Sequence, residues 1–550
     1  MMLLKENASN EKLRGGYYTP KLLTDFIARW GFNGRYPISV LEPSCGDGNF
    51  IESLSKIDGD FHCIGIEINN EELEKAKNRI LNHNNFKLIN TDFYMFYEEM
   101  VNKQQFDLII GNPPYIRYQY LTEQQRNEQS LILTSSGMKS NKLINAWVSF
   151  VVASIHLLSE NSRIGLVIPA ELLQVAYSEG LRAYLMQKLQ KITVITFKEL
   201  VFPNVEQEVV VFLGEKISSF EGEHQIKLLE YNNINDLTEN FNAENINYMD
   251  VEYNNSKWTS YFLTANENEL IQQIKGDSRF VLFDDVADVD IGITTGNNDF
   301  FCVSLDTVER YNLSEVTRPL IARSVSIRGT YYDELEWKYN IDRGAKAFLL
   351  DFPSDNFDDY PEGHKRYILE GEERKEHLGY KCSIRERWYR VPSIWIPEAF
   401  LLRRNYLYPK FVLNKVAAVS TDTMHRIKFK NGINPKLAVL AHYNSIALAF
   451  TEIEGRSYGG GVLEILPGEA EKIILPNLFN LMIPDTIIDE LIGLIEEFIR
   501  NNDDISGLLP ELDRRILVDF LNVPEKVVVS FRGIWIKLRE RRINRGKKKS

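Results

Sequence analysis

Residues 38–57, ISVLEPSCGDGNFIESLSKI, pass from an apolar segment through a glycine-containing turn into a segment with helical character. Apolar stretches of about four to eight residues bounded by turn residues are typical of buried strands. Similar units follow along the first 215 residues. Strands are expected at 62–68, 86–90, 106–111, 163–169, 191–197 and 206–214, and helices at 70–83 and 145–159. This alternation predicts a doubly wound α/β fold, in which helices cover both faces of a mostly parallel Rossmann-like sheet.

The alternation ends near residue 215, and the composition changes there. Residues 216–285 are rich in Asn and acidic side chains, which predicts an acidic connecting segment. Residues 286–480 have short, aromatic-rich segments with turn signals and predict a mixed α/β or mainly β domain. Residues 481–550 have helical apolar spacing at first and a basic tail at the end. The sequence therefore predicts a first domain over 1–215 followed by these three parts.

Composition excludes several classes of protein. Apolar residues make up 44% of the 550 residues and charged residues 26%, as in ordinary globular proteins. There is no apolar run long enough for a membrane span and no signal-peptide pattern at the start. The four cysteines are far apart, which argues against a zinc site or a disulfide framework and for a reducing cytoplasm.

The net charge of −13 hides two basic blocks. Residues 381–430 contain 11 Lys/Arg and 3 Asp/Glu, and residues 531–550 contain 9 Lys/Arg and 1 Glu. A polyanion responds to this local charge, so a nucleic-acid partner remains open. The first block interleaves aromatic residues with cations, and the alternative is an ordinary solvated surface. The candidate DNA-binding residues are Arg385, Arg387, Arg390, Arg403, Arg404 and Lys410.

Acidic residues follow three successive predicted strands. Glu42, Glu67 and Asp92 stand where the carboxyl ends of parallel strands form a ligand-binding edge. The loop after the first strand has no phosphate-binding glycine pattern and no Lys or Arg, so a cationic ligand suits Glu42 and Asp47 better than a pyrophosphate does. Glu67 can accept from ribose hydroxyls, and Asp92 from an adenine amino group with Phe93 on the ring. S-adenosylmethionine fits this set, although each residue alone could be a solvated strand end.

The sequence GNPPY (111–115) follows the predicted strand 106–111. Its two prolines remove two backbone donors and fix two φ angles, so the loop is stiff. An adenine amino group is a poor nucleophile, and two acceptors on its hydrogens favour attack on a methyl group. The Asn112 side chain and the carbonyl of Pro113 can be these acceptors, Pro114 stiffens the loop, and Tyr115 can stack on the base. A merely stiff loop is the structural alternative.

These ordered segments resemble the γ group of DNA amino-methyltransferases, the Taq-like N6-adenine enzymes of type II restriction–modification systems. The resemblance covers about residues 14–215. GGYYTP (15–20) resembles the motif whose threonine and proline cap the cofactor, and LVFPNVEQEVVVFLG (200–214) the motif whose phenylalanine covers the extruded adenine. It implies the catalytic residues Asn112, Pro113, Pro114, Tyr115 and Phe202. It implies the cofactor-binding residues Thr19, Pro20, Glu42, Pro43, Gly46, Asp47, Glu67, Ile68, Asp92, Phe93 and Asn112, with a looser match at Phe150.

The resemblance also implies the fold and the activity. It implies a methyltransferase sheet over 1–215, a target-recognition domain over 286–480 and a helical C-terminus. The expected reaction transfers a methyl group from S-adenosylmethionine, without a metal, to N6 of a flipped adenine in double-stranded DNA. The expected setting is a bacterial or archaeal cytoplasm, at the nucleoid, with a separately encoded restriction endonuclease as a possible partner and no membrane.

Other functions share some of these features. The sequence Asn-Pro-Pro-Tyr also occurs in methyltransferases that modify protein glutamine or ribosomal RNA guanine, which usually lack a large C-terminal domain. A DNA-binding subunit with an inactive methyltransferase fold would not need an intact Asn112–Tyr115 segment. A fused nuclease is a third alternative, although only about 14 residues precede the first motif. Serine in place of Asn112 would suggest cytosine N4 as the target.

Overall fold

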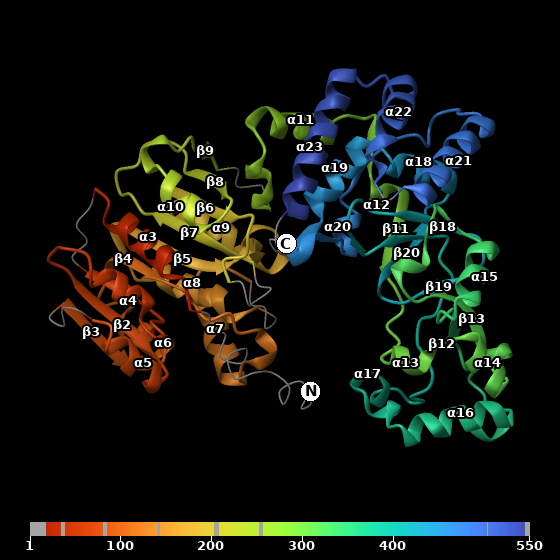
Figure 1. Ribbon diagram of the computed structural model, residues 1–550, viewed down its shortest axis with the longest axis horizontal. Coiled ribbons are helices and arrows are strands. Elements are labelled where there is room, and N and C mark those ends of the chain that lie inside the picture. Colours follow the sequence, from red (N-terminus) through yellow and green to blue (C-terminus); the bar gives the residue numbers. More distant parts are fainter. Residues whose placement is uncertain are drawn as a thin grey trace. The chain divides into compact units, whose positions relative to one another are not determined.

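The computed structural model describes residues 18–34, 39–80, 85–139, 144–202, 208–251, 257–502 and 504–544 (Figure 1). The chain divides into two compact units. The first comprises 1–265 with 544–550, and the second comprises 266–543. Within the described ranges, none of the helices combines the length and the apolar character that crossing a bilayer requires.

A nine-stranded sheet forms the centre of the first unit, in the order β3-β2-β1-β4-β5-β7-β6-β8-β9. The strands from β3 to β5 are parallel neighbours, whereas β7 runs antiparallel to both β5 and β6. The strands are β1 (Ser39–Glu42), β2 (His62–Glu67), β3 (Phe86–Asn90), β4 (Phe106–Gly111), β5 (Leu158–Pro169), β6 (Lys191–Phe197), β7 (Val209–Glu215), β8 (Gln225–Tyr231) and β9 (Met249–Asp250). The predicted doubly wound sheet is confirmed.

Helices cover both faces of this sheet. Residues of α6, α7, α8 and α9 belong to one hydrophobic cluster, and residues of α3, α4, α5 and α10 to the other. The helices are α3 (Lys21–Phe32), α4 (Asn49–Leu54), α5 (Asn70–Lys77), α6 (Phe93–Met100), α7 (Glu123–Ser135), α8 (Ala146–His156), α9 (Glu179–Lys188) and α10 (Ile234–Asn240). In β4, Leu108 and Ile110 pack into one cluster and Ile109 into the other, because successive side chains of a strand point to opposite faces.

The segment predicted as an acidic connection, 216–285, differs from that expectation. β8 lies inside it and pairs in parallel with β6 over seven residues, from Lys191–Gln225 to Phe197–Tyr231. Further along, Trp258 and Tyr261 belong to the core of the first unit. This strand lies near the sheet edge, and only Ile226 and Leu228 of β8 are buried. Because its neighbours in the sequence are Asn and acidic residues, the sequence pattern did not predict it.

The second unit is mixed α/β, as predicted, and contains four small sheets. Their strand orders are β11-β20-β16-β18-β14, β12-β15-β13-β19, β17-β22-β21 and β10-β23. The strands are β10 (Phe280–Leu282), β11 (Ala287–Ile291), β12 (Cys302–Val303), β13 (Thr317–Ile321), β14 (Tyr331–Tyr332), β15 (Phe348–Leu350), β16 (Ala399–Leu402), β17 (Arg404–Asn405), β18 (Phe411–Asn414), β19 (Val419–Ser420), β20 (Met424–Phe429), β21 (Arg456–Tyr458), β22 (Val462–Glu464) and β23 (Ile474–Pro476).

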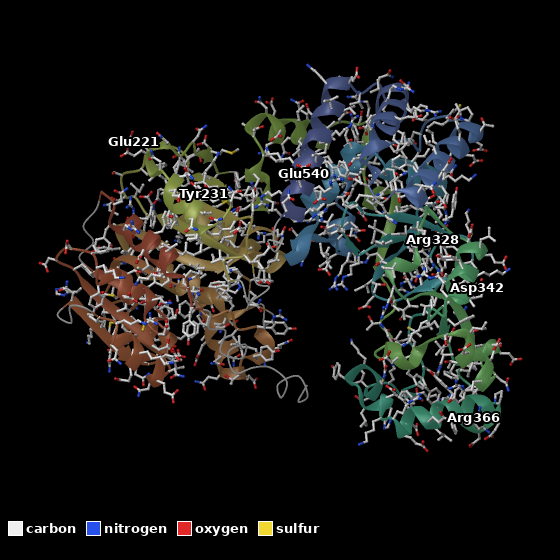
Figure 2. All side chains as sticks on the ribbon, viewed as in Figure 1. Glu221, Tyr231, Arg328, Asp342, Arg366 and Glu540 are labelled. Carbon is white, nitrogen blue, oxygen red and sulfur yellow. The ribbon has the colours of Figure 1, made fainter. Side chains whose placement is uncertain are left out.

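The helices of the second unit include a helical C-terminal part, as the spacing after residue 485 predicts. They are α11 (Ala265–Lys275), α12 (Phe283–Val286), α13 (Asn298–Phe301), α14 (Leu305–Tyr311), α15 (Glu334–Asp342), α16 (Glu362–Glu373), α17 (Tyr380–Ser383), α18 (Pro435–His442), α19 (Ser445–Glu454), α20 (Pro467–Ala470), α21 (Asp485–Asn501), α22 (Leu509–Asp513) and α23 (Glu525–Asn544). Buried Glu336 of α15 joins the sheets to this part, because it accepts from Arg500 of α21 at 2.8 Å and from Arg328 at 3.0 Å. Figure 2 labels Arg328 among the side chains of this unit.

The predicted basic tail is largely structural where it is described. Arg532 pairs with Asp513 at 2.7 Å. Arg542 donates to both oxygens of Glu452 at 2.9 and 2.5 Å, and both side chains are only 2% exposed. Residues 545–550 lie outside the described residues. Arg532 and Arg542 therefore pair with acids inside the second unit, although the sequence suggests that they could face a polyanion.

Candidate active site

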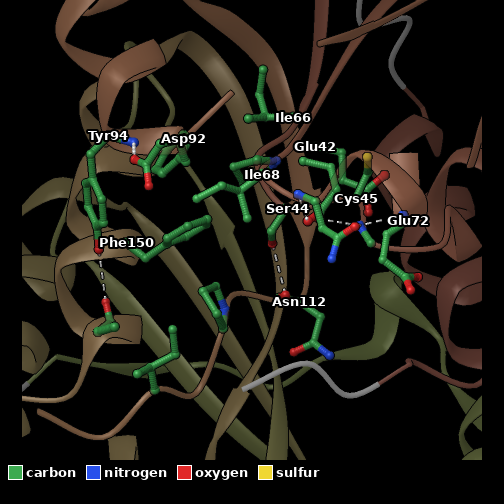
Figure 3. A pocket seen from close by; sticks show the side chains of 18 of the residues that line it. Glu42, Ser44, Cys45, Ile66, Ile68, Glu72, Asp92, Tyr94, Asn112 and Phe150 are labelled. Atoms are coloured by element: carbon green, nitrogen blue, oxygen red, sulfur yellow. Dashed lines mark hydrogen bonds between the residues drawn. The ribbon is translucent and has the colours of Figure 1, made fainter. Parts of the chain in front are cut away.

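A cavity of about 540 Å³ lies at the carboxyl edge of the sheet in the first unit (Figure 3). Segments that follow β1, β2, β3 and β4 line it, together with α7 and α8. Ten of the predicted cofactor-binding residues come together there: Thr19, Glu42, Pro43, Gly46, Asp47, Glu67, Ile68, Asp92, Phe93 and Asn112. Phe150 of α8 also lines the cavity, whereas Pro20 precedes the first residue of α3 and is not among the lining residues.

Glu42 is a buried acid at the end of β1, only 1% exposed. No described residue forms a hydrogen bond with its Oε2 atom. Burial raises the pKa of Glu42 well above its ordinary value, and the negative charges of Glu67 and Asp47 raise it further. Burial without a hydrogen-bond partner destabilises the charged form of an acid. This position therefore favours a ligand that brings a positive charge or a hydrogen-bond donor.

Glu67 fixes the glycine loop to the end of β2. One carboxylate oxygen accepts from the N–H of Gly46 at 2.9 Å and the other from the N–H of Asn69 at 2.8 Å. Gly46 has a φ of 51°, which a glycine adopts without steric cost. Burial raises the pKa of the Glu67 carboxyl, and these two N–H donors oppose part of that rise. The carboxylate is therefore held in one orientation at the cavity.

Two residues of the glycine loop, Asp47 and Gly48, contact α5 or the residue just beyond it. A Cβ on Gly48, which has a φ of 89°, would lie 2.7 Å from the Cα of Ala76 in α5. Asp47 forms an ion pair with Arg79, which lies just beyond α5. Burial nevertheless raises the pKa of Asp47 above its ordinary value. The predicted role of Asp47 toward a cationic ligand is thus shared with a fixed protein cation, which the sequence analysis missed.

An aromatic and apolar wall stands beside Asp92. Asp92 accepts from the N–H of Tyr94 at 2.7 Å and so begins α6, while it also lines the cavity. The rings of Phe93 and Phe150 lie with centroids 4.3 Å apart. The side chain of Ile68 is 66% exposed at the same cavity. An acceptor beside exposed apolar surface suits a flat, polar-edged ring such as adenine.

The chain before α3 reaches the same cavity. The Tyr18 hydroxyl donates to Glu72 of α5 at 3.1 Å, and the Asn49 side chain donates to the Thr19 carbonyl at 3.1 Å. These contacts hold Tyr18 and Thr19 in the wall. Residues 15–17, which carry the rest of the predicted N-terminal motif, lie outside the described residues.

The Asn112–Tyr115 segment leaves β4 at the cavity wall. The Ser44 hydroxyl donates to the Asn112 carbonyl at 3.0 Å (Figure 3). Asn112 and Pro114 line the cavity, and Pro113 is buried next to them. The Tyr115 hydroxyl donates to the Val167 carbonyl of β5 at 2.9 Å. Hydrogen bonds to two neighbouring strand ends therefore brace the segment on both sides.

Phe202 does not join this group. It is buried in the hydrophobic cluster on the α3 face and is not among the cavity-lining residues. The following residues, 203–207, lie outside the described residues. Stacking of Phe202 on a target base stays a prediction.

Helix α7 also contributes to the cavity, which no sequence pattern predicted. Gln125 and Gln129 of this helix line the cavity, and Gln129 is buried. The Asn145 side chain accepts from the N–H of Tyr118 at 3.2 Å, so it holds the chain that follows the Asn112–Tyr115 segment. No motif marks these residues, because their role depends on how α7 and α8 fold against the sheet.

The predicted DNA-binding cations lie in the second unit, and several are engaged there. Arg403 and Arg404 both pair with buried Glu464, at 3.0 and 3.2 Å. Arg387 donates to the carbonyl of Ser354 at 2.7 Å. The remaining contacts are Arg390 to the Phe352 carbonyl at 3.2 Å, Arg385 to the Thr294 carbonyl at 3.3 Å, and the backbone N–H of half-buried Lys410 to Asn405 at 3.4 Å.

The aromatic residues between these cations are packing residues. Tyr389 is buried in the core of this unit, and Trp388 lies 4.6 Å from Phe300. The predicted DNA-binding roles stay predictions. Within the described parts of the chain, no cluster of three or more His, Cys, Asp or Glu could hold a metal ion.

Comparison with known proteins agrees with this fold. The family Eco57I restriction-modification methylase matches residues 47–202, and the family Type II methyltransferase M.Eco57I, C-terminal domain, matches residues 255–517. The Type II methyltransferase M.AccI of Acinetobacter calcoaceticus is 24% identical over 533 residues, which cover 92% of this chain and 93% of that protein. M.HincII of Haemophilus influenzae is 30% identical over 202 residues, 36% of each chain.

A solved structure that is similar is the type IIG restriction endonuclease BpuSI, with 15% identity and a TM-score of 0.42. The match covers 97% of this chain and 67% of that one. The first unit has the α/β fold of a methyltransferase. The chain belongs to the Type II restriction–modification methyltransferase family.

Proposed function

We propose that this protein is a site-specific DNA methyltransferase that modifies N6 of adenine in double-stranded DNA. Within a restriction–modification system it would protect DNA from a separately encoded endonuclease. The observation that carries the proposal is the placement of Asn112 and Pro114 in the wall of a cavity that also contains Glu42, Glu67 and Asp92.

The cavity residues fit S-adenosylmethionine as the methyl donor. The buried acid Glu42 lacks a partner for Oε2 among the described residues, so a cationic group would stabilise its charged form. Glu67 is oriented by two N–H donors and keeps acceptor capacity for ribose hydroxyls. Ile68, Phe93 and Phe150 supply apolar surface for the adenine ring of the donor. When bound, this group supplies a methyl carbon made electrophilic by its positive sulfur.

Asn112 prepares the target amine. Its side-chain oxygen and the carbonyl of Pro113 accept one N6 hydrogen each, which draws the nitrogen toward the tetrahedral geometry needed for attack. The Ser44 hydroxyl holds the backbone carbonyl of Asn112 and the two prolines stiffen the segment, so little reorganisation is needed in the transition state. One hydrogen leaves N6 as a proton for solvent after the methyl group has bonded, so no titrating base is required.

Tyr115 is proposed to stack on the flipped adenine. Its hydroxyl is held by Val167 of β5, so the ring keeps one orientation beside Asn112. A flipped base loses its stacking partners in the duplex, and an aromatic face compensates part of that loss. Phe202 is proposed for the opposite face, which requires the ring to leave its buried position. Residues 286–480 of the second unit are proposed as the domain that recognises the DNA sequence.

Expression in a bacterium without its own DNA methylation tests the function. Mapping of modified bases should reveal N6-methyladenine at one short sequence, and the Asn112→Ala variant should leave the DNA unmodified. Methyl groups on cytosine N4 would correct the target base. Folded protein that binds the cofactor and leaves all DNA unmodified would refute the proposed substrate.

A further inference from the structure

One end of the second unit exposes apolar side chains on a rigid support. α13, α16 and α17 lie together there (Figure 1). We define the tip as residues 375–385, which include the turn Glu376–Leu378 and α17. Leu378, Tyr380 and Ile384 are 60%, 71% and 62% exposed. Large apolar side chains that gather on an exposed surface mark a binding site more often than isolated ones do.

Several contacts hold the tip in place. Cys382 of α17 is completely buried in the core of this unit. The Asn297 side chain donates to Glu376, and Arg385 donates to the Thr294 carbonyl at 3.3 Å. A Cβ on Gly296 would lie 2.7 Å from the Cβ of Lys381, so the loop 294–297 packs directly against α17. The exposed side chains are therefore presented by a supported element.

The charges of the tip favour a polyanion. Residues 375–385 contain Lys375, Lys381 and Arg385 but only one acid, Glu376, which is engaged by Asn297. Among the described residues, no acid pairs with the exposed side chains of Lys375 and Lys381. The buried Nη1 atom of Arg385 also lacks an acceptor among them. Apolar side chains flanked by cations match a surface in which phosphates border stacked bases.

We propose that this tip enters a groove of duplex DNA and places Tyr380 and Ile384 against the bases. Lys375 and Lys381 then meet the flanking phosphates. The inference rests on the proposed function and adds to it one element of the second unit that contacts the duplex. Apolar residues that wedge against base steps unstack them, and aromatic rings replace the lost stacking.

Paired variants of the full-length protein test the apolar contact. The double variant Tyr380→Ser, Ile384→Ser should bind the cognate duplex about tenfold more weakly than wild type, because stacking on an aromatic ring contributes on that scale. Val325→Ser with Leu335→Ser is the matched control, since these side chains are 79% and 77% exposed elsewhere in the same unit. Equal affinity of the two double variants would overturn the proposal.

The cations are tested by salt dependence. Lys375→Gln with Lys381→Gln should reduce the slope of log affinity against log salt by about 2, because each lost phosphate contact removes about 0.9. An unchanged slope would contradict the assignment of these two lysines to phosphates.

Thiol protection gives a measurement that does not depend on lost affinity. The four native cysteines, Cys45, Cys63, Cys302 and Cys382, are buried, so Ile384→Cys should create the readily modified thiol. Cognate duplex should slow its alkylation several-fold, whereas Leu335→Cys should react equally with and without DNA. Protection by self-association instead of DNA, seen as a concentration-dependent change in sedimentation, would make the tip an interface between copies and overturn the proposal.

These readouts separate the tip from the proposed function. If the wild-type protein methylates adenine while the tip variants bind like their control and the thiol stays unprotected, only the tip proposal fails. If duplex DNA protects the thiol and no adenine is modified, the tip is supported and the proposed reaction fails.

Discussion

Replacing Glu42 by Gln should stabilise the cofactor-free protein while it weakens cofactor binding. The wild-type side chain is 1% exposed, its Oε2 atom has no partner among the described residues, and burial raises its pKa well above 4.5. Because the folded pKa is raised, the unfolded chain releases this proton first as the pH rises. The stability contribution of Glu42 is therefore complete below pH 4.5 and declines as the pH rises through the folded pKa.

The size of this decline follows from proton linkage. One titrating group can change the free energy of unfolding by at most about 1.4 kcal/mol per pH unit. The Glu42→Gln variant keeps a similar shape and loses the titration, so its stability relative to wild type should increase from pH 5 to pH 8. Urea unfolding of both proteins across this range, without cofactor, measures the difference.

Glu52 provides a control of opposite sign. Hydrogen bonds from Lys21 and Lys56 lower the pKa of Glu52 to about 2, so its contribution is present above pH 4.5 and declines as the pH falls toward 2. Glu52→Gln should therefore lose stability relative to wild type at neutral pH, with no rise toward pH 8. The free energies of unfolding of Glu42→Gln and wild type could instead show parallel pH profiles from pH 5 to pH 8. Glu42 then does not carry the expected proton, and its role as a buried acid that binds a cationic ligand is refuted.

Three further substitutions probe the proposed roles. Asn112→Ala should abolish methyl transfer and leave the S-adenosylmethionine dissociation constant within a few-fold of wild type by calorimetry, and a large loss of affinity would reassign the residue to the cofactor. Glu67→Ala should weaken cofactor binding by more than about 1 kcal/mol, because a charged acceptor and two loop contacts are lost, and unchanged affinity would return Glu67 to a structural role. Phe202→Ala should reduce the fluorescence gain of 2-aminopurine at the target position and weaken binding by about 1–3 kcal/mol. Wild-type behaviour of this last variant in both assays would show that Phe202 remains in the core.

The sequence predicted the sheet and the residues around the cavity because both depend on local patterns. Buried strands require apolar runs, and a ligand at the strand ends requires particular side chains directly after them, as at Glu42 and Glu67. Asn112 could be placed for the same reason. The partner of Asp47 could not, because Arg79 meets it only after α4 and α5 fold against each other.

Long-range charge pairing explains most of the remaining differences. The sequence did not reveal the ion pairs of Arg403 and Arg404, because their shared partner Glu464 lies about 60 residues away and is brought close by the pairing of β17 with β22. The strand β8 was hidden because only two of its residues are buried and its neighbours are polar. Both depend on which segments become neighbours, and periodicity along the chain carries no information about that.

The ion pair between Arg542 and Glu452 constrains how the protein can be made. During translation, Glu452 is synthesised just before β21 and β22, whereas its partner Arg542 is synthesised 90 residues later. A carboxylate that is 2% exposed in the native state must stay hydrated until then, because an isolated buried charge costs several kcal/mol. The centre of the second unit therefore completes its packing only after α23 has been translated. A ribosome stalled before residue 542 should hold a nascent chain that proteases cut between 445 and 464.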